Sequence, residues 1–179
     1  MQAYHIFAVK FEKIMELSYK VATHKDIKAI REIANKTWFV TYEPILGKEQ
    51  PKFMFDEMYS EEALAKQMDE GQTFILQYLG EDVLAFASYS EKEGEGFTYK
   101  LNKLYLNPDF QGGGYGKKLI TFVEEEVKSL GAKNLDLNVN RYNKARFFYE
   151  KVGFEIIKEE DIPFGKYWMN DFVMRKVLS

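Results

Sequence analysis

The sequence contains no cysteine, and only two of its 179 residues are histidines, His5 and His24. The absence of cysteine excludes disulfides, thiolate metal sites and a cysteine nucleophile. A Ser–His–Asp triad or a histidine metal cluster would need one of the two histidines, and neither lies in a context typical of catalysis. We therefore expect chemistry that uses no metal ion and no covalent intermediate on the protein.

Long apolar runs are also absent, since no stretch reaches the roughly 18 apolar residues that a membrane-spanning helix needs. The N-terminal residues have neither a basic n-region nor a small-residue cleavage site, so they do not resemble a signal peptide. The formal net charge is −3, which disfavours non-specific binding to nucleic acid. We expect a cytoplasmic protein with no membrane and no nucleic-acid partner.

Hydrophobic residues make up 46% of the chain and aromatic residues 16%, which is enough to form a core without disulfides or metals. Residues 1–17 are interpreted as an N-terminal extension, and residues 18–179 as a single domain. We expect this domain to be a monomer or a homodimer.

Apolar periodicity and turn residues predict the secondary structure. Helices are expected over residues 27–41, 51–59, 61–70, 115–130 and 144–151, and Pro44 and Gly47 are expected to break the chain after the first of them. Strands are expected over residues 17–22, 74–79, 83–89, 97–106, 134–140, 154–158 and 168–177. This order predicts an α+β domain rather than a regular βαβ array.

The most informative segment is Gln111–Gly116, where a strand runs into four glycines, Gly112, Gly113, Gly114 and Gly116, and a helix starts at once. Glycines let successive backbone N–H groups point into one concavity, and a helix N-terminus adds unpaired donors and partial positive charge. The segment is therefore predicted to bind a phosphate or a diphosphate.

Two common phosphate loops do not fit this segment. A Walker loop needs Ser or Thr after its lysine, but Lys117 is followed by Lys118. A dinucleotide fingerprint that starts at Gly112 would need a glycine where Lys117 stands. The pattern that remains is Gln-x-x-Gly-x-Gly, formed by Gln111, Gly114 and Gly116.

This pattern resembles the pyrophosphate loop of the GNAT superfamily of acetyl-CoA-dependent N-acetyltransferases. A second stretch, Asn143-Lys-Ala-Arg-Phe-Phe-Tyr-Glu-Lys-Val-Gly-Phe154, resembles the block that follows the fifth strand in that superfamily. The resemblance implies a mixed, mostly antiparallel twisted sheet of six to seven strands with about four main helices. It also implies acetyl-CoA as co-substrate and direct transfer of the acetyl group to an amine in a ternary complex.

By the same resemblance, Tyr149 is the general acid that protonates the departing thiolate of coenzyme A. The end of the long strand over residues 97–106 and the glycine turn are implied to hold the cofactor through backbone groups. Asn143 is implied to form a hydrogen bond with the pantetheine arm. The complete set of expected cofactor-binding residues is Leu104, Tyr105, Leu106, Gln111, Gly112, Gly113, Gly114, Tyr115, Gly116, Lys117, Asn143 and Lys151.

The front half of the chain is similar in layout to a branch of the superfamily that includes polyamine acetyltransferases of the PaiA type. Trp38, Tyr42, Glu43 and Glu57 are therefore candidates for an aromatic, acidic cleft that would bind an alkylammonium group. The acceptor is expected to be a polyamine-like small molecule or a peptide amine. The base that deprotonates the amine is left open between water, Glu43 and Asp171.

Two rival functions remain at this point. One is a non-catalytic domain that binds acetyl-CoA and reports its level, and the other is a nucleotide-binding domain. Retention of Tyr149 beside an intact glycine turn argues against the first, and the two failed phosphate-loop patterns argue against the second.

Overall fold

The structure, a computed structural model, describes residues 16–110 and 112–179. Within these residues the chain forms seven strands, β1 Leu17–Val21, β2 Thr73–Leu79, β3 Asp82–Glu91, β4 Thr98–Leu106, β5 Asn134–Asn140, β6 Glu155–Phe164 and β7 Tyr167–Val177. The helices in the same residues are α1 Ile27–Leu46, α2 Glu49–Tyr59, α3 Glu61–Asp69, α4 Tyr115–Ser129 and α5 Ala145–Lys151, with 3₁₀ turns at His24–Asp26 and Pro108–Phe110.

The strands form one sheet in the order β1-β2-β3-β4-β5-β7-β6. Every neighbouring pair is antiparallel except β4 and β5, which run parallel because α4 carries the chain across between them. The predicted mixed, mostly antiparallel sheet in an α+β domain is confirmed. The described residues contain five α-helices, as many as periodicity predicts, where the resemblance implies about four main ones.

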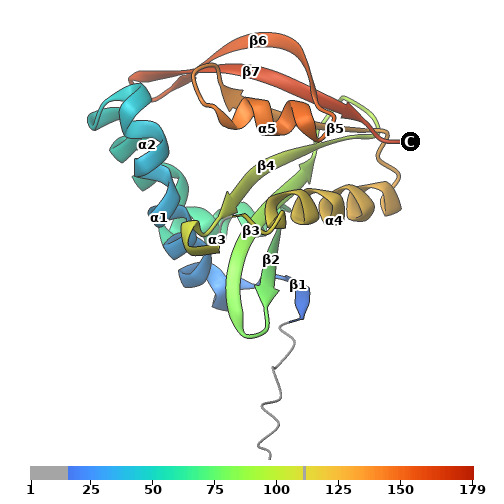
Figure 1. Ribbon diagram of the computed structural model, residues 1–179. Coiled ribbons are helices and arrows are strands. Elements are labelled where there is room, and N and C mark those ends of the chain that lie inside the picture. The colour runs from blue at the N-terminus through green and yellow to red at the C-terminus, as the bar shows by residue number, and fades with distance from the viewer. Residues whose placement is uncertain (1–15, 111) are drawn as a thin grey trace, which may run out of the picture.

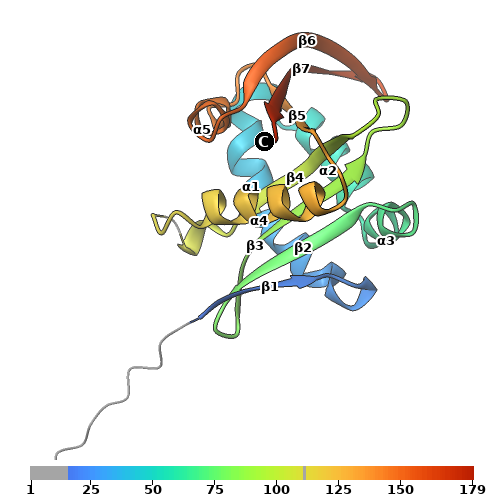
Figure 2. The ribbon, with the colours of Figure 1, turned by 90° about the vertical axis from the view of Figure 1, so that its right-hand side faces the viewer.

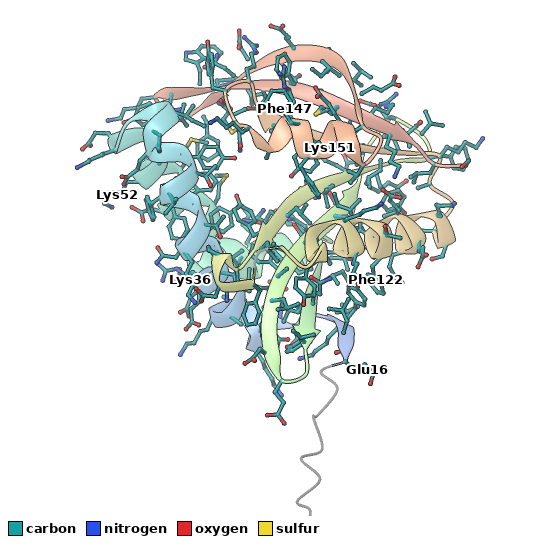
Figure 3. All side chains as sticks on the ribbon, viewed as in Figure 1. Glu16, Lys36, Lys52, Phe122, Phe147 and Lys151 are labelled. Atoms are coloured by element: carbon teal, nitrogen blue, oxygen red, sulfur yellow. The ribbon has the colours of Figure 1, made fainter. Side chains whose placement is uncertain are left out.

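Helices cover both faces of the sheet (Figures 1 and 2). α1, α2 and α3 pack on one face, and α4 and α5 pack on the other. The buried stripe of α4 consists of Leu119, Ile120, Val123 and Val127, which recur at helical spacing as the sequence predicts. At the edge of the same face, Phe122 of α4 stacks on Tyr19 of β1 with 4.2 Å between the ring centroids (Figure 3).

The parallel strands β4 and β5 separate beyond a short paired stretch. Pairing joins Thr98–Leu101 to Asn134–Leu137, whereas β4 continues to Leu106 and β5 to Asn140. A bulge in β4, opposite the step from Ser88 to Tyr89, lies at the point of separation. The backbone edge of β4 beyond Leu101 is therefore not used by β5, and the sheet opens between its two halves.

Two element boundaries differ from the sequence prediction by more than two residues. α1 continues to Leu46 with Pro44 inside it, and Gly47, at a φ of 75°, ends the helix instead. Pro44 lacks the N–H that would bond to the carbonyl of Val40. Val40 is 78% exposed, so water can take the place of that donor.

The second difference is β6, which extends to Phe164 instead of ending near residue 158. The added part contains the acidic run Glu159–Asp161 and then Pro163. β6 is an edge strand that pairs with β7 alone, and an edge strand tolerates both charges and proline.

The predicted N-terminal extension lies almost entirely outside the described residues, so it stays a prediction. Among the helices that the structure describes, none is long and apolar enough to cross a membrane.

Candidate functional site

The glycine turn lies between the end of β4 and the start of α4. Gly112 and Gly114 have φ angles of 92° and 67°, a region that L side chains rarely adopt, and Gly114 is the N-cap of α4. The ring of Tyr115 lies directly over Gly113, so any side chain at this position would require that ring to move. Gly112 and Gly114 favour glycine for their backbone conformation, and the predicted turn is confirmed as a structural element.

A cavity of about 360 Å³ opens beside this turn. The start of α4 forms one wall, the end of β4 forms another, and α5 closes the third side. Gly114 carries no side chain that could cap α4, so the first N–H groups of the helix stay available to a ligand. Together with the helix dipole they make this wall suitable for an anion.

Most of the predicted cofactor-binding residues line this cavity: Leu104, Tyr105, Leu106, Gly112, Gly114, Tyr115, Gly116 and Lys117. Gly113 lies in the turn but does not line the cavity. Lys151 is exposed on α5 and does not line it either (Figure 3). Asn143 lines an adjoining cavity, and Gln111 lies outside the described residues.

The adjoining cavity, of about 180 Å³, lies where β4 and β5 separate, and we call it the throat. It shares Leu104, Tyr105, Ala145 and Tyr149 with the cofactor cavity. Side chains of both separating strands line it, and Asn143 and Tyr149 contribute from the segment around α5. The separation of two parallel strands thus creates the connection from the glycine turn to the opposite face of the sheet.

Tyr149 lines both the cofactor cavity and the throat. Its ring packs against Phe148 and Phe154, with centroid distances of 5.5 and 5.9 Å. Its hydroxyl makes no hydrogen bond with any residue that the structure describes. Burial, with a smaller effect from Tyr42, raises the pKa of the Tyr149 phenol well above its usual value. The phenol therefore carries its proton throughout the neutral and mildly alkaline range.

Asn143 fixes the start of α5 and also faces the throat. Its Oδ1 accepts a hydrogen bond of 2.9 Å from the N–H of Ala145. Its Nδ2 donates to the Tyr42 hydroxyl over 3.5 Å, which is long for a hydrogen bond, so this donor can also serve a ligand. Burial raises the pKa of Tyr42 to about 12.

A third cavity, of about 320 Å³, lies on the face covered by α1, α2 and α3, and we call it the acceptor cavity. Aromatic side chains of Trp38, Tyr42, Tyr59 and Tyr105 form much of its wall. They are held in place, because the Trp38 indole donates to the Pro51 carbonyl at 2.8 Å and the Tyr59 and Tyr105 hydroxyls are 2.8 Å apart. The acceptor cavity shares Tyr42, Asn102, Lys103, Tyr105 and Asn138 with the throat.

The aromatic part of the predicted acceptor cleft is thus brought together, but its acidic part is not. Glu43 is exposed and lines a shallow groove between α1 and α2, because the helical turn directs it away from its neighbour Tyr42. Glu57 is exposed and lines none of the three cavities, because α2 directs Met54 and Met58 toward the acceptor cavity and Glu57 toward solvent. The prediction that Glu43 and Glu57 line the acceptor cavity is therefore wrong.

The charged residues that line the acceptor cavity are Lys100, Lys103 and Asp171. Burial raises the pKa of Asp171 to about 6 and lowers the pKa of Lys103 to about 8. Sequence reasoning considered Asp171 as a base but missed both lysines, since they belong to no motif. The signal that could have found them is the presence of two lysines inside a predicted central strand, where charged side chains are unusual.

The buried carboxyl of Asp171 is expected to cost stability at neutral pH. Its folded pKa of about 6 exceeds the unfolded value of about 3.9, so the folded state binds more protons between these values and stability falls as the pH rises from about 4 to about 6. Asp171→Asn should therefore raise the free energy of unfolding by about 1–3 kcal/mol at pH 7.5 and by little at pH 4. Urea unfolding at both values measures the difference.

Asp56→Asn is the matched control, since Asp56 is exposed and pairs with Lys52 at 2.6 Å. A gain for Asp171→Asn of the same size at pH 4 and pH 7.5 would contradict the assignment of the cost to the ionised carboxyl.

No three histidine, aspartate or glutamate side chains are grouped as a metal site would need in residues 16–110 and 112–179.

Comparison with known proteins finds acetyltransferases both in sequence and in structure. A family model described as an acetyltransferase (GNAT) domain matches residues 43–178. The spermidine N(1)-acetyltransferase of Thermoplasma acidophilum is 26% identical over 171 residues, which cover 90% of this chain and 98% of that protein.

Two solved structures share the fold over almost the whole chain. The PaiA N-acetyltransferase of Thermoplasma acidophilum in complex with coenzyme A superposes with a TM-score of 0.76 at 26% identity, covering 91% of this chain and 99% of that one. A GCN5-related N-acetyltransferase from Rhodopseudomonas palustris gives a TM-score of 0.76 at 20% identity, with 92% and 98% covered.

Proposed function

The chain belongs to the acetyltransferase (GNAT) domain family and is an N-acetyltransferase, and on that premise we propose that it moves the acetyl group of acetyl-CoA directly onto a primary amine of a small-molecule or peptide acceptor. The observation that supports this most strongly is the position of Tyr149, which lines both the cofactor cavity and the throat. This phenol therefore lies where the cofactor cavity and the throat meet.

The residues of the cofactor cavity suit acetyl-CoA. The free N–H groups at the start of α4 and the positive side chain of Lys117 suit the diphosphate. The edge of β4 beyond Leu101, which β5 leaves unpaired, offers backbone groups to the amides of the pantetheine arm, as an added strand would use them. The amide of Asn143 at the throat is a further donor for this arm.

The proposed reaction forms one C–N bond and breaks one C–S bond. A neutral amine attacks the thioester carbonyl, and a backbone N–H near Leu106 stabilises the oxygen on which negative charge develops. The bond to sulfur then breaks, Tyr149 donates its proton to the sulfur, and the new amide nitrogen releases its surplus proton to solvent. Because burial raises the pKa of this phenol, it stays protonated until a thiolate forms next to it, and its proton is restored from solvent.

The amine reaches the enzyme mostly as an ammonium ion and has to lose a proton before the attack. Asp171 is better placed for this than Glu43, because it lines the acceptor cavity, whereas Glu43 lies outside it. With a pKa of about 6 the Asp171 carboxyl is ionised at neutral pH and can accept a proton. Asp171 does not line the throat, so we propose that water carries the proton from the amine to this carboxyl.

Both a polyamine and a peptide amine fit the reaction as such. A polyamine is suggested by the layout of the front half of the chain and by the relative from Thermoplasma acidophilum, which is named for spermidine. The aromatic wall formed by Trp38, Tyr42, Tyr59 and Tyr105 suits an alkyl chain or an alkylammonium group.

The test is steady release of free thiol from acetyl-CoA with a panel of amines that includes polyamines, aminoglycosides, amino acids and peptide N-termini. We expect continuous turnover with at least one class and acetylated product by mass spectrometry. Binding of coenzyme A without thiol release from any amine would favour the non-catalytic regulator instead. Greater protection against heating by ATP or GTP than by coenzyme A would favour a nucleotide-binding domain.

A further inference from the structure

The acceptor cavity holds two ammonium groups against one carboxylate. Lys100 and Lys103 of β4 line it, and Asp171 of β7 is the acidic side chain among its lining residues. This is the opposite of the balance that a polycationic acceptor would need, because every additional ammonium group on a ligand would meet two cations of the same sign.

Lys100 is the more informative of the two lysines. It is half-buried, and its Nζ makes no hydrogen bond and no ion pair with any residue in the described part of the chain. Asp171 and Glu160 attract it from beyond ion-pair distance, and burial lowers its pKa. By contrast Lys92, on the preceding turn of the chain, contacts both Glu95 and Asp136 at 2.9 Å.

A half-buried cation without a partner is unfavourable, because the groups around it do not replace the water that it has lost. A binding site can contain such an unpaired ammonium group, at a cost in stability, where an anionic group of the ligand becomes its partner. Lys100 lines the acceptor cavity but neither the throat nor the cofactor cavity, so the missing partner would arrive with the acceptor.

The neighbours of Lys100 add further donors to the same cavity. The Nζ of Lys103 donates to the neutral Oε1 of Gln67 at 2.6 Å and lies over the rings of Tyr59 and Phe74, so it has no carboxylate partner. The Asn138 amide lies near enough to Asp171 to oppose the rise in its pKa. Its Nδ2 is nevertheless buried without a hydrogen bond of normal length inside the described ranges.

A cavity with unused donors is complemented by a group that only accepts hydrogen bonds, and an ionised carboxylate is such a group. We propose that the acceptor of this enzyme carries a carboxylate that pairs with Lys100 and Lys103, at the end of the molecule remote from the reacting amine. The inference rests on the proposed acetyl transfer to an amine. With two ammonium groups and one carboxylate, the cavity has a surplus of one positive charge, which a single carboxylate balances.

The orientation of the acceptor follows from which cavities the residues line. Lys103 lines both the acceptor cavity and the throat, whereas Lys100 lines the acceptor cavity alone. The amine therefore enters the throat beside Tyr149, the alkyl part lies along the wall formed by Trp38 and Tyr42, and the carboxylate stays near Lys100. A simple polyamine would place an ammonium group at that position.

Three acceptors that share a five-carbon chain with a terminal amine separate these possibilities: pentylamine, cadaverine and 6-aminohexanoate. With the wild-type protein and saturating acetyl-CoA, we expect kcat/KM for 6-aminohexanoate to exceed that for pentylamine by about 10-fold or more, as a charge-assisted pair would give. Cadaverine is expected to be the poorest of the three. A wild-type preference for cadaverine over 6-aminohexanoate would overturn the proposal.

Substitutions then assign the preference to the lysines. Lys100→Met should lower kcat/KM for 6-aminohexanoate about 10-fold while changing the value for pentylamine little, and Lys100→Arg should retain most of the preference. Lys103→Met is expected to act in the same direction. Lys133→Met is the matched control, because Lys133 is exposed at the turn before β5 and lines none of the three cavities.

The two levels of the proposal fail in different ways. If none of the three amines releases thiol while coenzyme A still binds, acetyl transfer to such amines is wrong. If all three are acetylated and Lys100→Met changes their kcat/KM equally, the enzyme is an acetyltransferase but the carboxylate is not recognised by Lys100.

Discussion

Tyr149→Phe is expected to lower kcat about 100- to 1,000-fold, which is the usual contribution of a positioned proton donor. The phenol is the protein group that lines both the cofactor cavity and the throat and carries an unpartnered, protonated hydroxyl. Without it, the thiolate of coenzyme A would have to leave without a proton or take one from water. The ring remains in place against Phe148 and Phe154, so the KM for acetyl-CoA is expected to change less than about threefold.

Tyr142→Phe is the matched control for this experiment, because Tyr142 is 75% exposed and lies seven positions earlier on the same segment. The measurement is a full kinetic analysis of both variants together with the midpoint of thermal unfolding. Loss of coenzyme A affinity in proportion to the loss of kcat, accompanied by a lower melting temperature, would show that Tyr149 is a packing residue.

Gly116→Asp is expected to weaken the binding of coenzyme A by about 100-fold or more. Gly116 is the second residue of α4 and lines the cofactor cavity. A carboxylate there would stand a few ångströms from the proposed place of the diphosphate, and repulsion between unit charges at this range near a protein surface is about 3–4 kcal/mol. Isothermal titration with coenzyme A measures the effect.

Gly116→Asp should leave folding intact, so a loss of coenzyme A binding would not result from unfolding. A Cβ at Gly116 would lie 3.5 Å from the Phe148 ring, an ordinary contact, and acidic residues in the first turn of a helix are favourable. Gly116→Ala is the control for the added Cβ and should bind coenzyme A within about fivefold of wild type. Equal affinities of the aspartate and alanine variants for coenzyme A would place the diphosphate elsewhere.

Local signals in the sequence predicted the elements around the cofactor. The strand Asn134–Asn140 alternates and is bounded by turn residues, and the structure has it with the same limits. The glycine turn could be located because its glycines lie close together in the sequence, and Gly112 and Gly114 have φ angles that L side chains rarely adopt. In each case the physical cause acts over a few neighbouring residues.

The acceptor cavity could be predicted only in part, because its shape depends on contacts between distant segments. Periodicity separated the buried side of α1 from the exposed one, but it could not tell whether the glutamate next to Tyr42 faces a cavity, and Glu43 lies on the outer side. The roles of Lys100 and Lys103 depend on the bulge in β4 and on the point where β5 leaves it. Neither feature has a marker in the sequence around these lysines.

The short parallel seam between β4 and β5 also bears on the order in which the chain folds. Antiparallel neighbours such as β2 and β3 or β6 and β7 are joined by tight turns, so their contacts close short loops. The seam can form only after the chain between β4 and β5, which includes α4, has closed a much longer loop. Closing a longer loop costs more entropy and is slower. The cofactor cavity and the throat are both lined by β4 on one side of this seam and by residues around α5, which follows β5, on the other. We therefore expect the ability to bind the cofactor to be among the last properties that the folding chain acquires.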